Sequence, residues 1–205
     1  MTTRAAAVQS GLNLEYFTVA WNALEAIVAL ICGWVAGSIA LTGFGLDSLI
    51  EVSSGGILLW RLRSDRNVAR REEVERRALI LVGISLLALA AYVAGESVLS
   101  LVRREASERS LPGIVLAMAA LIVMPLLARA KRRVASTIGS PALQADSRQT
   151  DICAYLSAIL LLGLLLNAGL RWWWADSAAG LGMAPLITYE GVQALRGKTC
   201  CPDCR

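Results

Sequence analysis

Most charged residues of this chain lie in short segments that separate long apolar runs. Of its 205 residues, 56% are hydrophobic, which makes the chain more apolar than a typical soluble domain. A run of about 20 apolar residues is long enough for one helix to cross the hydrocarbon core of a bilayer. The alternation therefore predicts an all-α membrane protein.

We expect six membrane-spanning helices that form one bundle. Residues 1–13 are then an N-terminal tail, residues 14–195 form the transmembrane domain, and residues 196–205 form a C-terminal tail that carries cysteines. The predicted spans are Leu14–Val35, Ile39–Trp60, Ala78–Val102, Leu111–Ala128, Leu143–Leu170 and Trp173–Leu195.

Basic residues cluster on one side of the predicted bundle. Arginines are dense between the second and third spans, from Arg61 to Arg77, and basic residues recur from Arg129 to Arg133 between the fourth and fifth. The connections on the other side hold fewer. Because an excess of basic residues marks the cytoplasmic face, we expect both the N and C termini to be cytoplasmic.

Two acidic residues, Asp47 and Glu51, interrupt the second span one helical turn apart. A spacing of four places both side chains on the same face of a helix. A single carboxylate near the bilayer centre costs about 2.5–3.5 kcal/mol, so a pair of them needs to be neutralised. We favour a bound cation, and the alternative is an interhelical hydrogen bond or a salt bridge to Arg148.

The polar start of the fifth span offers two more candidate ligands. Gln149 and Cys153 are also four residues apart and share one stripe of the helix. Carboxylates suit hard divalent ions, and a thiolate moves the preference toward zinc, cobalt or cadmium. We therefore predict a metal site formed by Asp47, Glu51, Gln149 and Cys153. Taken singly, Cys153 would most often be a small buried apolar residue, and Gln149 would most often form an interhelical hydrogen bond.

Other polar groups lie within the predicted spans. We expect Asp176 and Glu190 near opposite ends of the sixth span, within reach of water, and we consider Glu25 and Glu96 candidates for a water-filled path. The chain has no histidine, so it lacks the side chain that usually carries protons near neutral pH.

Three cysteines crowd the C-terminal tail, namely Cys200, Cys201 and Cys204. A C-x-x-C pair can bind soft metal ions, and an inert tail is the alternative. Elsewhere the sequence has no Ser/His/Asp set and no phosphate-binding loop. We therefore expect no enzymatic activity, no organic cofactor and no nucleic-acid partner.

Several of these motifs resemble those of the cation diffusion facilitator family. The resemblance extends from about Leu14 to Leu195. Its most specific parts are Gly-Ser-Ile-Ala-Leu at residues 37–41, Gly-Leu-Asp-Ser-Leu-Ile-Glu at residues 45–51, Gln-Ala-Asp at residues 144–146, Ala-Asp-Ser at residues 175–177 and Tyr-Glu-Gly at residues 189–191.

The resemblance implies a fold, an activity and a ligand set. Family members have six transmembrane helices with cytoplasmic termini, usually act as homodimers, and export divalent metal ions in exchange for protons. Their second-helix ligand pair corresponds to Asp47 and Glu51. Alignment on Ala145-Asp146 places the fifth-helix pair at Gln149 and Cys153, whereas a shifted register would give Ser147 and Asp151.

The chain also departs from the family pattern. The usual histidine and aspartate of the fifth helix are missing in the preferred register, and the chain ends shortly after Leu195, where a cytoplasmic metal-binding domain typically follows. We therefore expect a short form of the family, in a bacterial plasma membrane, that exports zinc, cobalt or a similar ion in exchange for protons. The alternative is a membrane protein that binds metal or assists assembly without transport.

Overall fold

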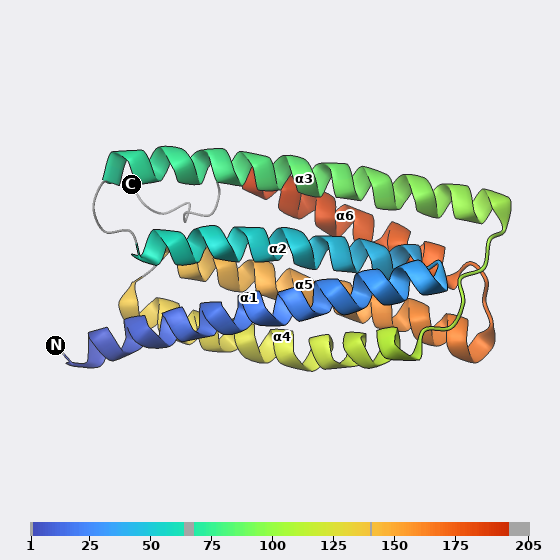
Figure 1. Cartoon of the computed structure of the whole chain (residues 1–205), viewed down its shortest axis with the longest axis horizontal. Coiled ribbons are helices and arrows are strands. Elements are labelled where there is room, and N and C mark those ends of the chain that lie inside the picture. The colour runs from blue at the N-terminus through green and yellow to red at the C-terminus, as the bar shows by residue number, and fades with distance from the viewer. Residues whose placement is uncertain (1, 64–67, 140, 197–205) are drawn as a thin grey trace.

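A computed structural model describes residues 2–63, 68–139 and 141–196. These residues form six α-helices that run alternately up and down in one elongated bundle (Figure 1). The helices are α1 (Thr2–Ala36), α2 (Ile39–Arg63), α3 (Val68–Arg103), α4 (Leu111–Ile138), α5 (Pro141–Leu170) and α6 (Ala175–Leu195). We call the end where α1 begins and α6 finishes the terminal end of the bundle, and the other end the opposite end.

The first five predicted spans lie within the first five helices. The sixth helix begins at Ala175, two positions after the predicted start, and α1 begins at Thr2. The helix α1 therefore continues through residues that the sequence assigned to the N-terminal tail.

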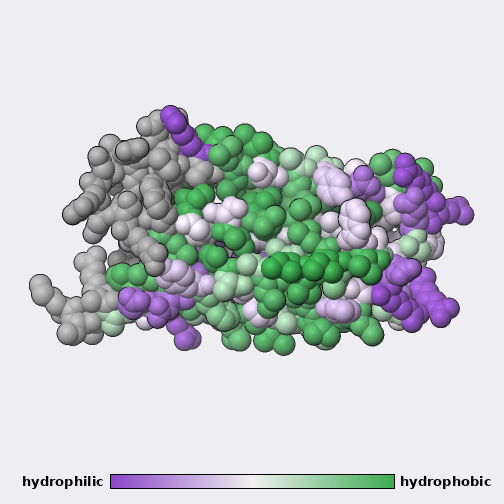
Figure 2. Space-filling view, in the orientation of Figure 1, coloured by the Kyte–Doolittle hydropathy of each residue, from purple (hydrophilic) through white to green (hydrophobic). Residues whose placement is uncertain are grey.

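Four helices in the described part of the chain are long and apolar enough to cross a membrane. They contain the stretches Ala6–Ala36, Leu79–Arg103, Leu111–Thr137 and Asp146–Leu170. Apolar side chains cover the middle of the bundle and polar ones its ends (Figure 2). Trp34 is 86% exposed and Ile122 64% exposed, as expected for side chains that face lipid. The protein is thus an integral membrane helical bundle.

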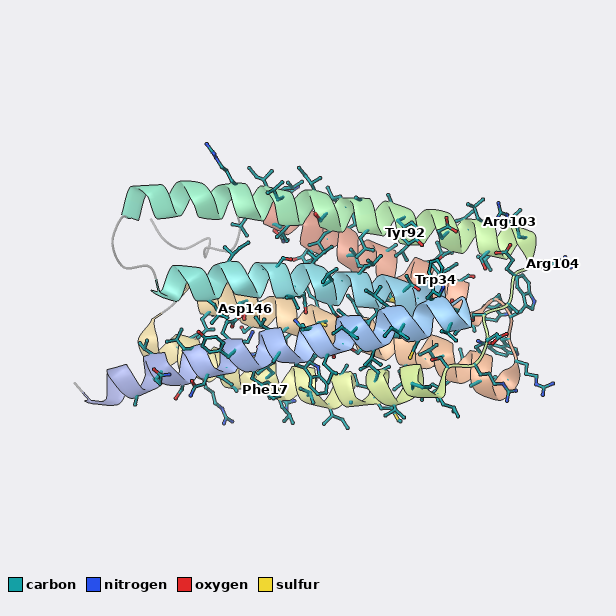
Figure 3. The ribbon with its side chains drawn as sticks, viewed as in Figure 1. Phe17, Trp34, Tyr92, Arg103, Arg104 and Asp146 are labelled. Carbon is teal, nitrogen blue, oxygen red and sulfur yellow. The ribbon has the colours of Figure 1, made fainter. Side chains whose placement is uncertain are left out.

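Aromatic and charged side chains also separate into those along the outside of the helices and those at an end of the bundle. Phe17 and Trp34 point outward from α1, and Tyr92 from α3, while Arg103 and Arg104 extend from the opposite end (Figure 3). Arg104 adopts a φ of 56° where the chain leaves α3. These arginines mark an end of the bundle that is suited to water.

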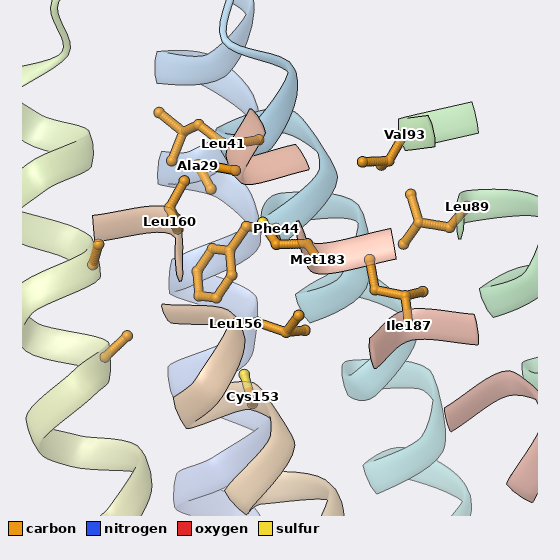
Figure 4. Packing of buried hydrophobic residues seen from close by; sticks show 14 of the residues in the cluster. Ala29, Leu41, Phe44, Leu89, Val93, Cys153, Leu156, Leu160, Met183 and Ile187 are labelled. Carbon is orange, nitrogen blue, oxygen red and sulfur yellow. The ribbon is translucent and has the colours of Figure 1, made fainter. Parts of the chain in front are cut away.

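The helix α2 occupies an inner position, because it contacts α1, α3, α5 and α6. Its Phe44 is fully buried and lies among Leu156 of α5 and Met183 of α6 (Figure 4). The side chains of α2 therefore face protein over much of the helix, so a polar residue on α2 can be kept from lipid.

Small residues let α3 and α6 approach backbone to backbone. A Cβ atom added at Gly83 would lie 2.9 Å from the carbonyl oxygen of Gly191, and one added at Gly191 would lie 3.1 Å from that of Gly83. Such contacts are typical of helix packing in membranes. Glu190, the residue before Gly191, is rotated by about 100° around the helix and so lies on a different face from the one against α3.

The start of α2 is tied to the start of α6. Gly37 takes a φ of 61° in the turn after α1, a conformation that glycine adopts without strain. Asp176 of α6 then accepts hydrogen bonds from the Ser38 hydroxyl at 2.5 Å and from the backbone N–H of Ile39 at 2.8 Å. This contact fixes the level of α6 along the bundle relative to α2.

Candidate metal site

Three of the four predicted ligands come together in the interior of the bundle. A carboxylate oxygen of Asp47, one of Glu51 and the sulfur of Cys153 all lie within 4.8 Å of one another. Asp47 and Cys153 are fully buried, and Glu51 is 7% exposed. Asp47 and Glu51 come from α2 and Cys153 comes from α5, so the cluster bridges two helices.

Most of the acidic oxygens in this cluster have no hydrogen-bond partner among the described residues. Both oxygens of Asp47 and Oε1 of Glu51 are unpartnered, while Oε2 of Glu51 accepts a hydrogen bond from the amide of Asn22 at 2.7 Å. Burying an ionised carboxylate without a partner is strongly unfavourable. A cation between these groups would remove that penalty.

The spacing of the cluster is close to that of a metal-ligand set. Zinc bonds to carboxylate oxygens at about 2.0–2.2 Å and to thiolates at about 2.3 Å, so tetrahedral ligands lie roughly 3.4–3.6 Å apart. The cluster therefore needs only a small inward shift of its side chains to surround an ion. Two carboxylates and a thiol can hold a divalent transition metal.

Gln149, the fourth predicted ligand, lies one helical turn from Cys153 toward the terminal end. Its side chain is half-buried, and its side-chain amide makes no hydrogen bond with the described residues. Gln149 as a ligand stays a prediction.

Residues of the shifted register are engaged elsewhere. Asp151 forms an ion pair with Arg132 of α4, and the Ser147 hydroxyl donates a hydrogen bond to the carbonyl of Gln144 at 2.7 Å. Arg148, the alternative partner of the second-span acids, has an exposed side chain. In this structure the unpartnered oxygens of Asp47 are thus not held by Arg148.

Glu25 of α1 extends the acidic character of the interior. It is fully buried and accepts hydrogen bonds from the indole N–H of Trp21 at 2.5 Å and from the Ser48 hydroxyl at 3.4 Å. Ser48 follows Asp47 on α2, so Glu25 lies beside the cluster with partners of its own.

Glu190 of α6 lies in the interior, whereas the sequence suggested a position near an interface within reach of water. It is only 7% exposed, and neither of its carboxylate oxygens has a hydrogen-bond partner among the described residues. A signal was present in the sequence: Met183 and Ile187, seven and three positions earlier, are apolar and place Glu190 on the stripe of α6 that faces the core.

Glu96 and Asp176 border a small polar cavity near the opposite end. The cavity has a volume of about 200 Å³ and is also lined by Ser100, Glu105 and Ser177 among others. Asp176 is 2% exposed to solvent and its carboxylate is engaged at the start of α2. The cavity thus brings acidic and hydroxyl groups to the end of the bundle that carries Arg103.

An ion-pair network lies between the cluster and the terminal end. Lys131 of α4 is fully buried and forms ion pairs with Glu15 of α1, at 3.2 Å, and with Asp146 of α5. The network links three helices. The tail cysteines Cys200, Cys201 and Cys204 lie outside the described residues.

Sequence comparison relates this chain to known membrane proteins. The chain is 25% identical to the uncharacterized transporter sll1263 of the cyanobacterium Synechocystis over 170 residues, which cover 79% of this chain and 54% of the relative. It is 23% identical to transmembrane protein 163 of Xenopus laevis over 190 residues, which cover 91% of this chain and 66% of the relative. The chain thus matches about half to two thirds of the length of these relatives.

A family model gives the wider match. The cation efflux transmembrane domain matches residues 16–198, a stretch that includes all three residues of the buried cluster and nearly all of the described helices. The chain therefore belongs to the cation efflux family, whose members are membrane transporters of cations.

Proposed function

We propose that this protein exports a divalent transition-metal ion, zinc, cobalt or a similar ion, in exchange for protons. The ion binds to Asp47, Glu51, Gln149 and Cys153. The observation that carries this proposal is the buried cluster in which two carboxylates and a thiol lie within 4.8 Å of one another. Both oxygens of Asp47 lack a partner among the described residues, so a cation is the group that best fits between them.

The mixed donor set favours a transition metal over calcium or magnesium. Oxygen ligands alone would suit hard ions, and a thiol adds a soft donor that such ions do not prefer. Two carboxylates, one thiol and a weakly binding amide should hold such ions less tightly than the Cys and His sets of structural zinc sites. Moderate affinity suits a transporter, because the cargo must also leave.

Exchange for protons follows from the chemistry of the ligands. Carboxylates and thiols bind a metal ion in their deprotonated forms, so metal binding releases protons. The chain has no histidine, so Asp47, Glu51 and Cys153 themselves would carry the exchanged protons. Proton movement is then tied to occupation of the site by the metal.

Six membrane spans and cytoplasmic termini complete the proposed topology. Basic residues near the terminal end, such as Arg132 of α4 and Arg196 directly after α6, support a cytoplasmic assignment of this end. The ion would enter there, bind between α2 and α5, and leave after the helices rock against one another. The polar cavity at the opposite end supports an outward path. We further propose that the protein acts as a homodimer in a bacterial plasma membrane.

Transport by purified protein tests this function. In proteoliposomes with an imposed pH gradient, we expect flux of Zn²⁺ or Co²⁺ that is lost in Asp47→Asn. Asp151→Asn is a matched control, because it neutralises an acid that pairs with Arg132 instead, and it should retain flux. Binding of metal without flux by the folded wild-type protein would favour the alternative, a metal-binding membrane protein that does not transport.

A further inference from the structure

Glu190 is a buried acid that the proposed ligand set leaves without a role. Its side chain is 7% exposed, and both carboxylate oxygens lack a partner among the described residues. Glu15 and Asp176, also buried acids, each have an ion pair or hydrogen bonds. An isolated carboxylate within a membrane protein is costly to keep, so its position needs an explanation.

The level of Glu190 along the bundle matches that of the acidic pair on α2. Asp176 accepts a hydrogen bond from the backbone of Ile39, which sets a common starting level for α6 and α2. At a rise of 1.5 Å per residue, Glu51 then lies about 18 Å from this level along α2, and Glu190 about 21 Å along α6. The two carboxylates are therefore offset by only about 3 Å along the axis of the bundle.

The side of α6 that carries Glu190 faces the same interior. Met183 and Ile187 belong to the core cluster together with Cys153 and Leu156 of α5 (Figure 4). Going toward the terminal end, Cys153 follows Leu156 by about one turn on α5, and Glu190 follows Ile187 by about one turn on α6. Both therefore lie just beyond the same apolar layer.

Electrostatic proximity is consistent with this placement. Glu190 lies close enough to Asp47 and Glu51 for their negative charges to repel one another, and its charge also acts on the sulfur of Cys153. A third carboxylate in this place would only add to the repulsion if the site stayed empty. A divalent cation turns that repulsion into attraction.

We propose that Glu190 is a further ligand of the transported cation, contributed by α6, a third helix beside the two that hold the other ligands. This inference rests on the proposed function, because it concerns the same ion. Glu190 lies on the side of Glu51 that faces the terminal end. Among the described residues, it is therefore a carboxylate without a partner that an ion meets between this end and the Asp47 cluster, and it couples the position of α6 to occupation of the site.

Cadmium binding to the purified full-length protein in detergent tests the proposal. We expect Glu190→Gln to weaken Cd²⁺ binding at least tenfold, whereas Glu96→Gln, which neutralises an acid at the polar cavity, should leave the affinity unchanged. Unchanged affinity in Glu190→Gln would overturn the proposal. Each variant is first checked by size-exclusion chromatography.

A second variant separates direct ligation from an effect of charge alone. In a background in which serine replaces Cys32, Cys200, Cys201 and Cys204, Cys153 supplies the one remaining thiolate, and the ultraviolet Cd²⁺–thiolate absorbance per bound ion reports it. Glu190→Cys should roughly double this absorbance, and Glu96→Cys should not change it. No increase with Glu190→Cys would overturn direct ligation even if Glu190→Gln binds weakly.

A result that refutes the proposed function would differ from one that refutes only the role of Glu190. If the wild-type protein binds no Cd²⁺, or if Asp47→Asn binds it as tightly as wild type, the metal site itself is wrong and Glu190 has no ion to hold. If Asp47→Asn abolishes binding and Glu190→Gln does not weaken it, the site stands and only the role of Glu190 is refuted.

Discussion

Replacement of Lys131 by methionine should destabilise the bundle more than any change to a surface charge. Lys131 is fully buried and pairs with Glu15, which is also fully buried, and with Asp146, whose side chain is 17% exposed. Lys131→Met retains much of the volume of the side chain but removes the only positive charge that these two acids contact among the described residues. The two carboxylates are then left in the interior of a membrane protein.

The expected loss follows from the burial of the network. Removing one partner of a buried ion pair typically costs about 3–5 kcal/mol, because the remaining charge is buried without compensation. The neighbouring residue offers a matched control. Arg132 also pairs with an acid of α5, Asp151, but the two side chains are 43% and 32% exposed, and such pairs contribute about 0–1 kcal/mol.

Reversible unfolding in mixed micelles, followed by circular dichroism, measures both losses. We expect Lys131→Met to lower the free energy of unfolding by about 3–5 kcal/mol and Arg132→Met by at most about 1 kcal/mol. The triple variant Glu15→Leu/Lys131→Met/Asp146→Asn removes the stranded charges and should regain the wild-type stability. Equal losses in the two single variants, or a triple variant no more stable than Lys131→Met, would refute the reasoning.

Three other predictions follow from single contacts. Asp176→Ala should lower stability by about 1–2 kcal/mol in the same unfolding assay, because Asp176 caps the start of α2 through Ser38; an unchanged stability would contradict the cap. Gly163→Ala should lower the free energy of unfolding by about 1–3 kcal/mol, since the added Cβ would lie 2.5 Å from the Cβ of Ala179. As a control, the Cβ added in Gly95→Ala meets no atom within 4 Å, so this change should raise the free energy of unfolding by about 0.4–1 kcal/mol. Arg148→Ala should leave Cd²⁺ affinity within about twofold of wild type, a change of at most about 0.4 kcal/mol; a large change would support Arg148 as a partner of the site.

The helices themselves were readable from the sequence, because each depends on a long apolar run bounded by charge. Helix ends were less accurate where the helix leaves the apolar region. The first helix extends back to Thr2 and the third begins at Val68, through polar residues that have good helix propensity but no hydropathy signal. Hydropathy reports where a bilayer can be crossed, and not where a helix stops.

Part of the candidate site was also readable, since a spacing of four on one helix fixes a common face. Asp47 with Glu51 illustrates this. For the fifth helix the sequence favoured Gln149 with Cys153 but left Ser147 with Asp151 as an alternative register, because no local pattern fixes which turn meets that face. Cys153 does so within 4.8 Å, whereas the position of Glu190 depends on how α6 is anchored through Asp176, which no local pattern states.

The helices that carry these buried acids are also the ones that hydropathy supports least. Among the described residues, α2 and α6 are not among the four helices apolar enough to cross a membrane alone, and they hold Asp47, Glu51 and Glu190. Helix α2 contacts four other helices, and α6 contacts α2, α3 and α5, so protein rather than lipid surrounds their polar faces. Because a carboxylate in lipid costs several kcal/mol, α2 and α6 depend on their neighbours to remain in the membrane. The same neighbours close the interior around the acids, so the helices least suited to lipid are those that carry the acidic groups of the proposed cation site.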